Sequence, residues 1–462
     1  MRVRSLKKVK PLLLGVVAST LPMAASAADN TVLYSGFPVT LSAYSGDATH
    51  SVSYKGQMAR HVLHDSLKKL VSGGDKAAMM AYYAGKSADR KIIAPASKGD
   101  FKIKQTMVSD LSKKNLQGKT YKGIVNGWVG SMTGDEAVLF MIDKAAASKK
   151  GVDLLNGYDY TQLISKFLMG AVFYNQAVDV YLDEKLEADT KPNDQPYKKG
   201  TAYTGKEHIW DEAFGYFGAP AHGLTLSAKQ VYGIAKRKDL AAADFNKDGV
   251  VDLYTEMAFA HGYYAASLDK GGKTSYFHDI SQAFLDGRNL IVAAKGQKLS
   301  DSQRAKLKGY AATIKRNWEK VIAELVFKYA GETYEDLVKI TGNSGNAKEN
   351  YRKYIKHWGE LKGFALALQV GGKDLGGTSV QLNRLVGYGP VMIGNTQVKG
   401  LDDNGEYIQG AAVTMEEYML NMLKVQNLMK EAFSIKARAH DQTAGLEKLA
   451  EELSVKDNSE ND

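Results

Sequence analysis

Residues 300–330 read SDSQRAKLKGYAATIKRNWEKVIAELVFKYA, and a single apolar stripe runs through them. Ser300 and Gln303 form the pattern of a capping box, in which the two residues satisfy each other's backbone N–H groups at the start of a helix. Behind this cap, large apolar side chains recur every three or four residues, which is the repeat of one helix face. The stripe comprises Leu307, Tyr310, Ile314, Trp318, Val321, Leu325 and Tyr329. The segment is therefore predicted to be a helix that buries one side.

Other segments repeat this pattern. Thr414 and Glu417 form a second capping box, and a second stripe follows on one helix face. That stripe comprises Tyr418, Met422, Val425, Met429 and Phe433. Further helices are predicted over residues 58–71, 105–115, 133–147, 159–185, 206–217, 226–236, 254–268, 277–295 and 349–370. Methionine and aromatic stripes of this kind are typical of the core of a helical bundle.

The segments between the helices are of two kinds. Residues 31–41 and 386–393 alternate in polarity as short strands do. Residues 186–205 and 371–411 are rich in Gly, Asp, Asn and Lys, which predicts long loops. The predicted fold class is therefore all-α, mainly helical, with long loops and minor short strands.

The N-terminal residues have the three features of a secretory signal peptide. Positive charges come first, an apolar run follows over residues 12–21, and Ala25, Ser26 and Ala27 form an A-x-A cleavage site. The apolar run is too short for a membrane anchor of the mature chain. We therefore predict a signal peptide over residues 1–27, cleaved near Ala27, and a periplasmic or secreted protein without a transmembrane anchor.

Composition excludes several classes of function. The chain has no cysteine, so it has no disulfide, no thiolate metal site and no cysteine nucleophile. The formal net charge is +10, and removal of the five positive charges in the signal segment leaves +5. Such a small charge on a long chain does not indicate a nucleic-acid-binding protein. Residues 441–462 are locally acidic and are predicted to be a solvated C-terminal tail.

The segment Asp244-Phe-Asn-Lys-Asp-Gly-Val-Val-Asp252 has the spacing of a calcium-binding loop. The predicted ligands are Asp244, Asn246, Asp248, the carbonyl of Val250, Asp252 and Glu256. Gly249 stands at position six, where the loop turns sharply. Position twelve is Thr255 instead of the usual Glu, and Glu256 follows one residue late. We predict a structural Ca²⁺ site, whereas the alternative is an Asx-rich turn without an ion.

A second candidate site combines imidazoles and carboxylates. It comprises His208, Asp211, Glu212, His357 and Glu360. Residues three or four apart share a helix face, so each histidine can point the same way as an acidic neighbour. Two such helices facing each other would hold a transition metal, Fe or Zn. The alternative is that the histidines bond buried carboxylates and brace the bundle.

The two histidines also hint at an internal repeat. Aligning Trp210 with Trp358 places Glu212 on Glu360, with the histidines offset by one residue. We interpret this as a duplicated helical bundle. The predicted domain, residues 28–440, then has halves of about 28–240 and 254–440, joined by the calcium-type loop 244–256.

Four runs of sequence resemble a bacterial exported family described as domain of unknown function 4856. They are VSYKGQ (52–57), ISKFLMGA (164–171), HIWDEAFGYFG (208–218) and HWGELKGFA (357–365). That family looks related in architecture to the imelysin-like proteins. The resemblance implies a helical, exported protein with a double bundle, linked to iron acquisition. The imelysin motif is Gly-x-His-x-x-Glu, whereas Gly205 here lies three residues before His208, and Asp211 stands where that motif has Glu.

Three hypotheses for function follow. The leading one is an exported binding protein of a metal- or iron-acquisition system, which takes a metal ion or a metal-carrying ligand and contacts an outer-membrane or cell-envelope protein. The second is a metallopeptidase-like hydrolase in which Glu212 or Glu360 acts as general base. The third is a calcium-stabilised interaction module without a transition-metal site. An enzymatic role is the less favoured interpretation, because no HExxH or GxSxG motif is present.

Overall fold

In the computed structural model, which describes residues 33–187, 190–371 and 375–459, the long helix predicted from the apolar stripe is α10 (Asp301–Thr341). Its capping box is confirmed: the N–H of Gln303 donates to Ser300 Oγ at 3.2 Å, and the N–H of Ser300 donates to Gln303 Oε1 at 2.9 Å. Trp318, Val321 and Leu325 are buried as predicted. The capping box therefore fixes where the helix begins, and the apolar stripe determines which side of the helix is buried.

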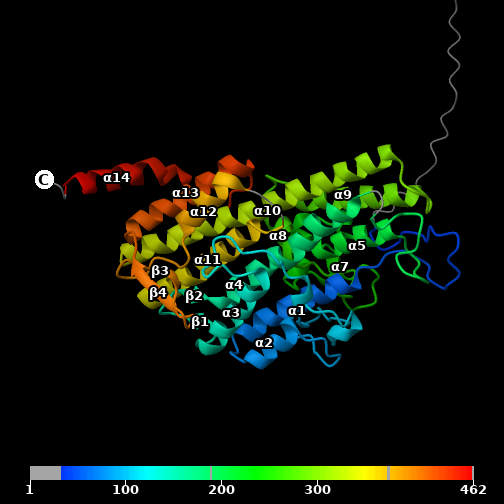
Figure 1. The fold of residues 1–462 in the computed structure, drawn as a ribbon, viewed down its shortest axis with the longest axis horizontal. Coiled ribbons are helices and arrows are strands. Elements are labelled where there is room, and N and C mark those ends of the chain that lie inside the picture. The colour runs from blue at the N-terminus through cyan, green and yellow to red at the C-terminus, as the bar shows by residue number, and fades with distance from the viewer. Residues whose placement is uncertain (1–32, 188–189, 372–374, 460–462) are drawn as a thin grey trace, which may run out of the picture. The chain divides into compact units, whose positions relative to one another are not determined.

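The described chain is mainly helical, which confirms the predicted fold class (Figure 1). The other helices are α1 (Lys55–Val71), α2 (Lys76–Tyr83), α3 (Gly134–Ala147), α4 (Tyr160–Leu168), a π-helix (Met169–Tyr181), α5 (Gly205–Phe217), α6 (Ala228–Ala235), α7 (Leu240–Ala243), α8 (Ala260–Asp269), α9 (Tyr276–Ala293), α11 (Ala347–Leu368), α12 (Gly376–Val386), α13 (Met415–Phe433) and α14 (Leu446–Ser459). Short 3₁₀ turns cover Val108–Asp110, Gln117–Lys119, Glu184–Leu186, Gly223–Thr225 and Thr443–Gly445. Among the described helices, none has both the length and the hydrophobicity of a membrane-spanning segment.

The strands form two small antiparallel hairpins. β1 (Val152–Asp153) pairs with β2 (Tyr158–Asp159), and β3 (Thr396–Leu401) pairs with β4 (Tyr407–Ala411). The second hairpin turns at Gly405, which has a φ of +73°, and Asp402 Oδ1 accepts the N–H groups of Asn404 and Glu406. An Asp-x-Asn-Gly turn of this kind is a strong hairpin signal.

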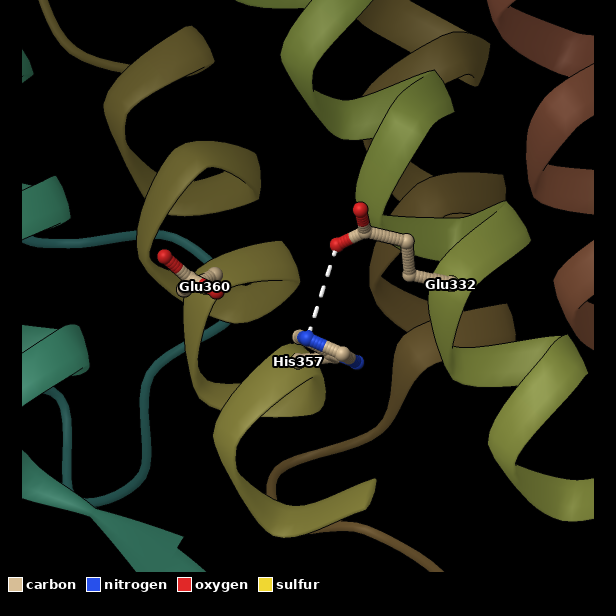
Figure 2. A group of neighbouring side chains, drawn as sticks. All are labelled: Glu332, His357 and Glu360. Atoms are coloured by element: carbon tan, nitrogen blue, oxygen red, sulfur yellow. Dashed lines mark ion pairs between the residues drawn. The ribbon is translucent and has the colours of Figure 1, made fainter. Parts of the chain in front are cut away.

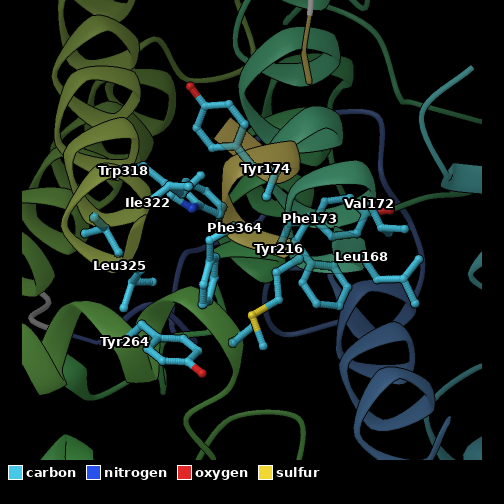
Figure 3. Packing of buried hydrophobic residues seen from close by; sticks show 14 of the residues in the cluster. Leu168, Val172, Phe173, Tyr174, Tyr216, Tyr264, Trp318, Ile322, Leu325 and Phe364 are labelled. Carbon is cyan, nitrogen blue, oxygen red and sulfur yellow. The ribbon is translucent and has the colours of Figure 1, made fainter. Parts of the chain in front are cut away.

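The core gathers around α10, which packs against α9, α11 and α13. Large aromatic residues from several helices meet there (Figure 3). Trp210, Trp318 and Trp358 are fully buried in this core. The indole N–H of Trp358 donates to the hydroxyl of Tyr418 at 2.7 Å, which links α11 to α13.

The helix predicted over residues 159–185 is present but changes type partway. It continues from α4 into the π-helix that ends at Tyr181. Gly170 lies at the change, where a Cβ would overlap Ala367 on α11. The close approach of the two backbones therefore requires glycine at this position.

Several predicted boundaries are wrong. Residues 105–115 form only a 3₁₀ turn, because the Thr106 carbonyl and the Val108 N–H bond to residues 92 and 90 and not within a helix. The helix predicted from residue 254 begins only at Ala260, after a turn. The described residues of 31–41 form no strand, and neither does 386–393.

One of the two predicted loops also differs from the structure. Helix α12 and the β3–β4 hairpin occupy most of the described part of the predicted loop 371–411. The predicted signal peptide and its predicted cleavage site lie outside the described residues. The described C-terminal residues from Leu446 are helical, in α14.

Candidate functional site

Four acidic and imidazole side chains lie between α10 and α11, which a short turn joins into a hairpin. Glu332 and Asp336 are four residues apart on α10, so they share one face, and His357 and Glu360 are three apart on α11. Because these two helices pack along each other, the two faces meet. Figure 2 shows His357 and Glu360 on one helix with Glu332 across from them.

This group is compact enough for one metal ion. One ligand atom from each of Glu332, His357 and Glu360 lies within 4.8 Å of the others, and no other group of three His, Asp or Glu residues does so in the described part of the chain. His357 Nε2 is 3.6 Å from Glu332 Oε2. The side chain of Glu332 is 15% exposed, that of His357 18% and that of Glu360 8%. Water and ions can therefore reach a site that is largely buried.

Asp336 holds the imidazole of His357 from behind. Its Oδ2 is 2.6 Å from His357 Nδ1, and its side chain is 3% exposed. Nδ1 therefore donates to Asp336, and Nε2 is directed toward the Glu332 side. Metal-binding histidines are oriented by carboxylates in the same way.

A second imidazole lies on the other side of Glu332. His440, which follows α13, places Nε2 3.1 Å from Glu332 Oε1 and Nδ1 3.0 Å from Glu335 Oε1. The Glu332 carboxylate therefore lies between two histidines. His440 is 39% exposed, so it can turn toward or away from the site.

Lysines neutralise the carboxylates. Lys328 Nζ is 2.7 Å from Glu332 Oε1, Lys166 Nζ is 3.4 Å from Glu360 Oε1, and Lys356 Nζ is 3.6 Å from Glu360 Oε2. Burial would raise the pKa of Glu360, but the ammonium groups outweigh burial and hold the pKa below its ordinary value. Glu360 is therefore a carboxylate at neutral pH, with or without a metal.

The structure assigns Asp211 to a different network. Its Oδ1 accepts Arg288 Nε at 2.8 Å, and Arg288 also contacts Glu207 at 3.1 Å. All three side chains are fully buried. Burial raises the pKa of Asp211 to about 6, although Arg288 opposes the shift. Asp211 therefore pairs with Arg288 and does not lie beside His208.

His208 and Glu212 lie together on α5, as predicted, with Nε2 3.7 Å from Oε2. They do not belong to the group around His357, so the structure does not bring the two predicted pairs to one point. Glu212 also accepts Gln57 Nε2 at 2.7 Å. The surrounding cavity is lined by several lysines, and excess positive charge disfavours a metal cation there.

The predicted calcium ligands lie on a tight turn. The N–H of Asp248 donates to Asp244 Oδ1 at 3.1 Å and to Asn246 Oδ1 at 2.9 Å. Gly249, at position six, has a φ of +85°, which only glycine adopts easily. The N–H of Val250 donates to Asp248 Oδ1 at 3.0 Å. The first five positions therefore already have the folded-back form that a calcium loop needs.

Glu256 folds back over the same turn. Its Oε1 accepts the N–H groups of Phe245 and Asn246, and its Oε2 accepts the N–H of Asp252 at 2.8 Å. Burial raises the pKa of Glu256 above its ordinary value, although these N–H donors oppose the shift. Glu256 stands one residue after position twelve of the loop pattern, yet its carboxylate still lies against the loop.

The far end of the loop is anchored to residues 102–105. The N–H of Val251 donates to the Lys102 carbonyl at 2.8 Å, and Gln105 Nε2 donates to Asp252 Oδ1 at 2.7 Å. An ion held by Asp244 and Asp248 would fix this junction as well as the loop.

Three members of the α10–α11 site are missing from the sequence-based prediction: Glu332, Asp336 and His440. Their separations from His357 along the chain carry no motif. The only local signal is the four-residue spacing of Glu332 and Asp336, which lie just beyond the helix predicted over residues 300–330. It becomes informative only when α10 is known to pack on α11.

Comparison with known proteins identifies the family. Residues 42–375 match the family described as Domain of unknown function (DUF4856). The match covers more than two thirds of the 462 residues, so the chain belongs to this family. No curated protein and no solved structure matches the chain.

Proposed function

We propose that this member of the DUF4856 family is a metal-binding protein that holds iron or zinc between α10 and α11. The observation that carries the proposal is the convergence of Glu332, His357 and Glu360, with Asp336 on the far nitrogen of the imidazole. One imidazole and two carboxylates form a ligand set suited to zinc or iron. His440 supplies a second imidazole when it turns inward from Glu332.

The lysines around the site are compatible with metal binding. Lys328 and Lys356 are 25% and 44% exposed, so their ammonium groups can swing into water when a metal takes their place. Lys166 is 2% exposed and stays with Glu360 Oε1, which leaves Oε2 for the ion. When the site binds a metal, one divalent cation therefore replaces the ammonium groups of Lys328 and Lys356.

We also propose that the protein acts outside the inner membrane in metal acquisition. The N-terminal signal pattern and the resemblance to imelysin-like proteins support this role. Its partners would be a metal ion or a metal-carrying ligand and a cell-envelope protein. The loop from Asp244 to Glu256 would bind a structural Ca²⁺ ion, since the Asp244 and Asp248 carboxylates already fold over the turn at Gly249 and accept its N–H groups.

A second candidate function is a calcium-braced interaction module without a transition metal. The observation that favours it is the close pairing of Lys328 with Glu332, which satisfies that carboxylate without any ion. In that case the histidines stabilise the α10–α11 hairpin and nothing else.

Zinc titration in competition with a chromophoric chelator separates the two candidates. The metal-binding function predicts one tight site in the wild type. His357→Ala removes a direct ligand, so it should weaken binding by more than the roughly 10–100-fold expected for a residue that only orients a ligand. His208→Ala, a matched change at the other candidate histidine, should leave the affinity unchanged. Absence of a tight site in the wild type would favour the interaction module.

A further inference from the structure

A cavity of about 310 Å³ opens beside the start of α1 and the solvent-facing side of α5, apart from the α10–α11 group. Its lining has six cationic side chains and a single carboxylate, that of Glu212. The cations are Lys55, Arg60, Lys114, Lys119, Lys185 and Lys198. In the described part of the chain, none of these six makes an ion pair with an acidic side chain. The cavity therefore has excess positive charge.

The lone carboxylate is already engaged. Glu212 accepts Gln57 Nε2 at 2.7 Å and faces His208 Nε2 at 3.7 Å. Burial lowers the pKa of Lys119 to about 8, and Glu212 only partly opposes this effect. The neighbouring cations Arg60 and Lys185 lower it further. The protein thus holds several ammonium groups close enough to repel one another.

Three of the six cations, Lys119, Lys185 and Arg60, are held in position by the cavity wall. The ring of Tyr181, at the end of the π-helix, carries Lys185 Nζ 4.2 Å and Lys119 Nζ 5.5 Å from its centroid. The Tyr181 hydroxyl is also 3.2 Å from Lys119 Nζ. Arg60 is 5% exposed, and its Nε donates to the Asn115 carbonyl at 2.9 Å. An incoming anion would therefore meet charges that are already oriented.

His208 completes the wall. Its ring lies against Tyr197 and Tyr203, with centroids 4.1 Å and 4.6 Å away. Its Nδ1 is buried and has no hydrogen-bond partner among the described residues. A buried polar atom without a partner costs free energy unless a ligand or water satisfies it. The His208 ring forms part of the cavity wall, with Nε2 on the Glu212 side.

We propose that this cavity binds a small anion with two or more negative groups, either phosphate groups or carboxylates. A ligand with a single negative charge would leave most of the excess positive charge of the lining uncompensated. The volume of the cavity excludes a large ligand. Such a ligand relieves the repulsion between the lysines and places a charged oxygen between Arg60 and Lys119. The site uses no residue of the α10–α11 group, so it stands whether or not that group binds a metal.

The test is calorimetric titration of the mature protein, with calcium present throughout, using fructose 1,6-bisphosphate and tricarballylate as separate probes. Both chelate calcium poorly, so they test the cavity and not the loop at Asp244. Binding of the bisphosphate alone would identify phosphate as the recognised group, and binding of the tricarboxylate alone would identify carboxylate; either result supports the site. Affinity should fall as salt is added.

Lys119→Met should weaken the responding probe by at least about tenfold, because it removes an inner charge and keeps the apolar stem. Lys273→Met, at an exposed lysine outside the cavity, is the matched control and should bind like the wild type. Unchanged thermal midpoints would show that both variants fold. Absence of binding by either probe, or equal binding by the wild type and Lys119→Met, would overturn the proposal.

Discussion

Substitution of Arg288 by methionine should destabilise the fold strongly. The guanidinium contacts Asp211 at 2.8 Å, Glu207 at 3.1 Å and Ser51 Oγ at 2.7 Å, with both acidic side chains fully buried. Removing one partner of a buried ion pair leaves uncompensated buried charge and costs about 3–5 kcal/mol. At roughly 2 cal/mol/K per residue over 462 residues, this loss lowers the thermal midpoint by about 3–5 °C.

The loss should depend on pH in a definite direction. Burial already raises the pKa of Asp211 to about 6, so the folded state holds more protons than the unfolded state below that value. Stability from this group therefore falls as pH rises from about 4 to about 6. Without Arg288 the pKa rises further, so the gap between variant and wild type should be wider at about pH 8 than at about pH 5.

Urea denaturation followed by circular dichroism measures both effects. The matched control is Arg316→Met, at an exposed arginine of α10 that contacts Thr313, and it should change stability by no more than about 0.5 kcal/mol. Equal, small losses in both variants would refute the reasoning that the Arg288 network is a buried structural element. A gap that narrows as pH rises would refute the assignment of the uncompensated charge to Asp211.

Further predictions concern the candidate sites and the core. Asp336→Asn should weaken zinc binding about 10–100-fold while His357 remains present, as measured by chelator competition; an unchanged affinity would remove Asp336 as the orienting group. Calcium at one hundred times its Kd should stabilise the wild type by about 2.7 kcal/mol, visible as a higher thermal midpoint, and Asp248→Ala should lose that response. Gly170→Ala should cost about 1–3 kcal/mol in urea denaturation through overlap with Ala367, and a neutral result would mean that α11 can shift at no cost.

Local patterns predicted the helices that have both a cap and a stripe. The capping boxes at Ser300 and Thr414 are present, and the helices behind them begin where the sequence predicts. A pattern of this kind is local, because the cap and the buried face both lie within one segment. The segment 105–115 has no Ser or Thr capping box and no apolar stripe behind one, and its backbone at Thr106 and Val108 bonds to residues 90–92 instead.

Site residues were harder to predict because their partners come from distant segments. His357 and Glu360 share a helix face as expected, yet their companions come from α10 and not from α5. Spacing along the chain identifies which residues share one face of a helix. It does not identify which face of another helix packs against them. Asp211 illustrates the same limit, since its partner Arg288 lies on α9 and no motif relates the two.

The turn types also depended on single residues. Residues 386–393 alternate like a strand, but α12 ends at Val386 and the strands form after Gly394 instead. The turn at Asp402–Gly405 is what sets the register of the β3–β4 hairpin. The residues of the turn therefore determine where the strands of this hairpin lie, whereas the alternation of polarity did not predict their positions.

Anomalous diffraction at the zinc absorption edge, from crystals of the mature protein grown with zinc, tests the metal-binding function most directly. The account predicts one strong anomalous peak between α10 and α11, about 2.0–2.1 Å from His357 Nε2 and within bonding distance of Glu332 and Glu360 oxygens. A peak at His208, or no peak near His357 while zinc binds elsewhere on the surface, would contradict it.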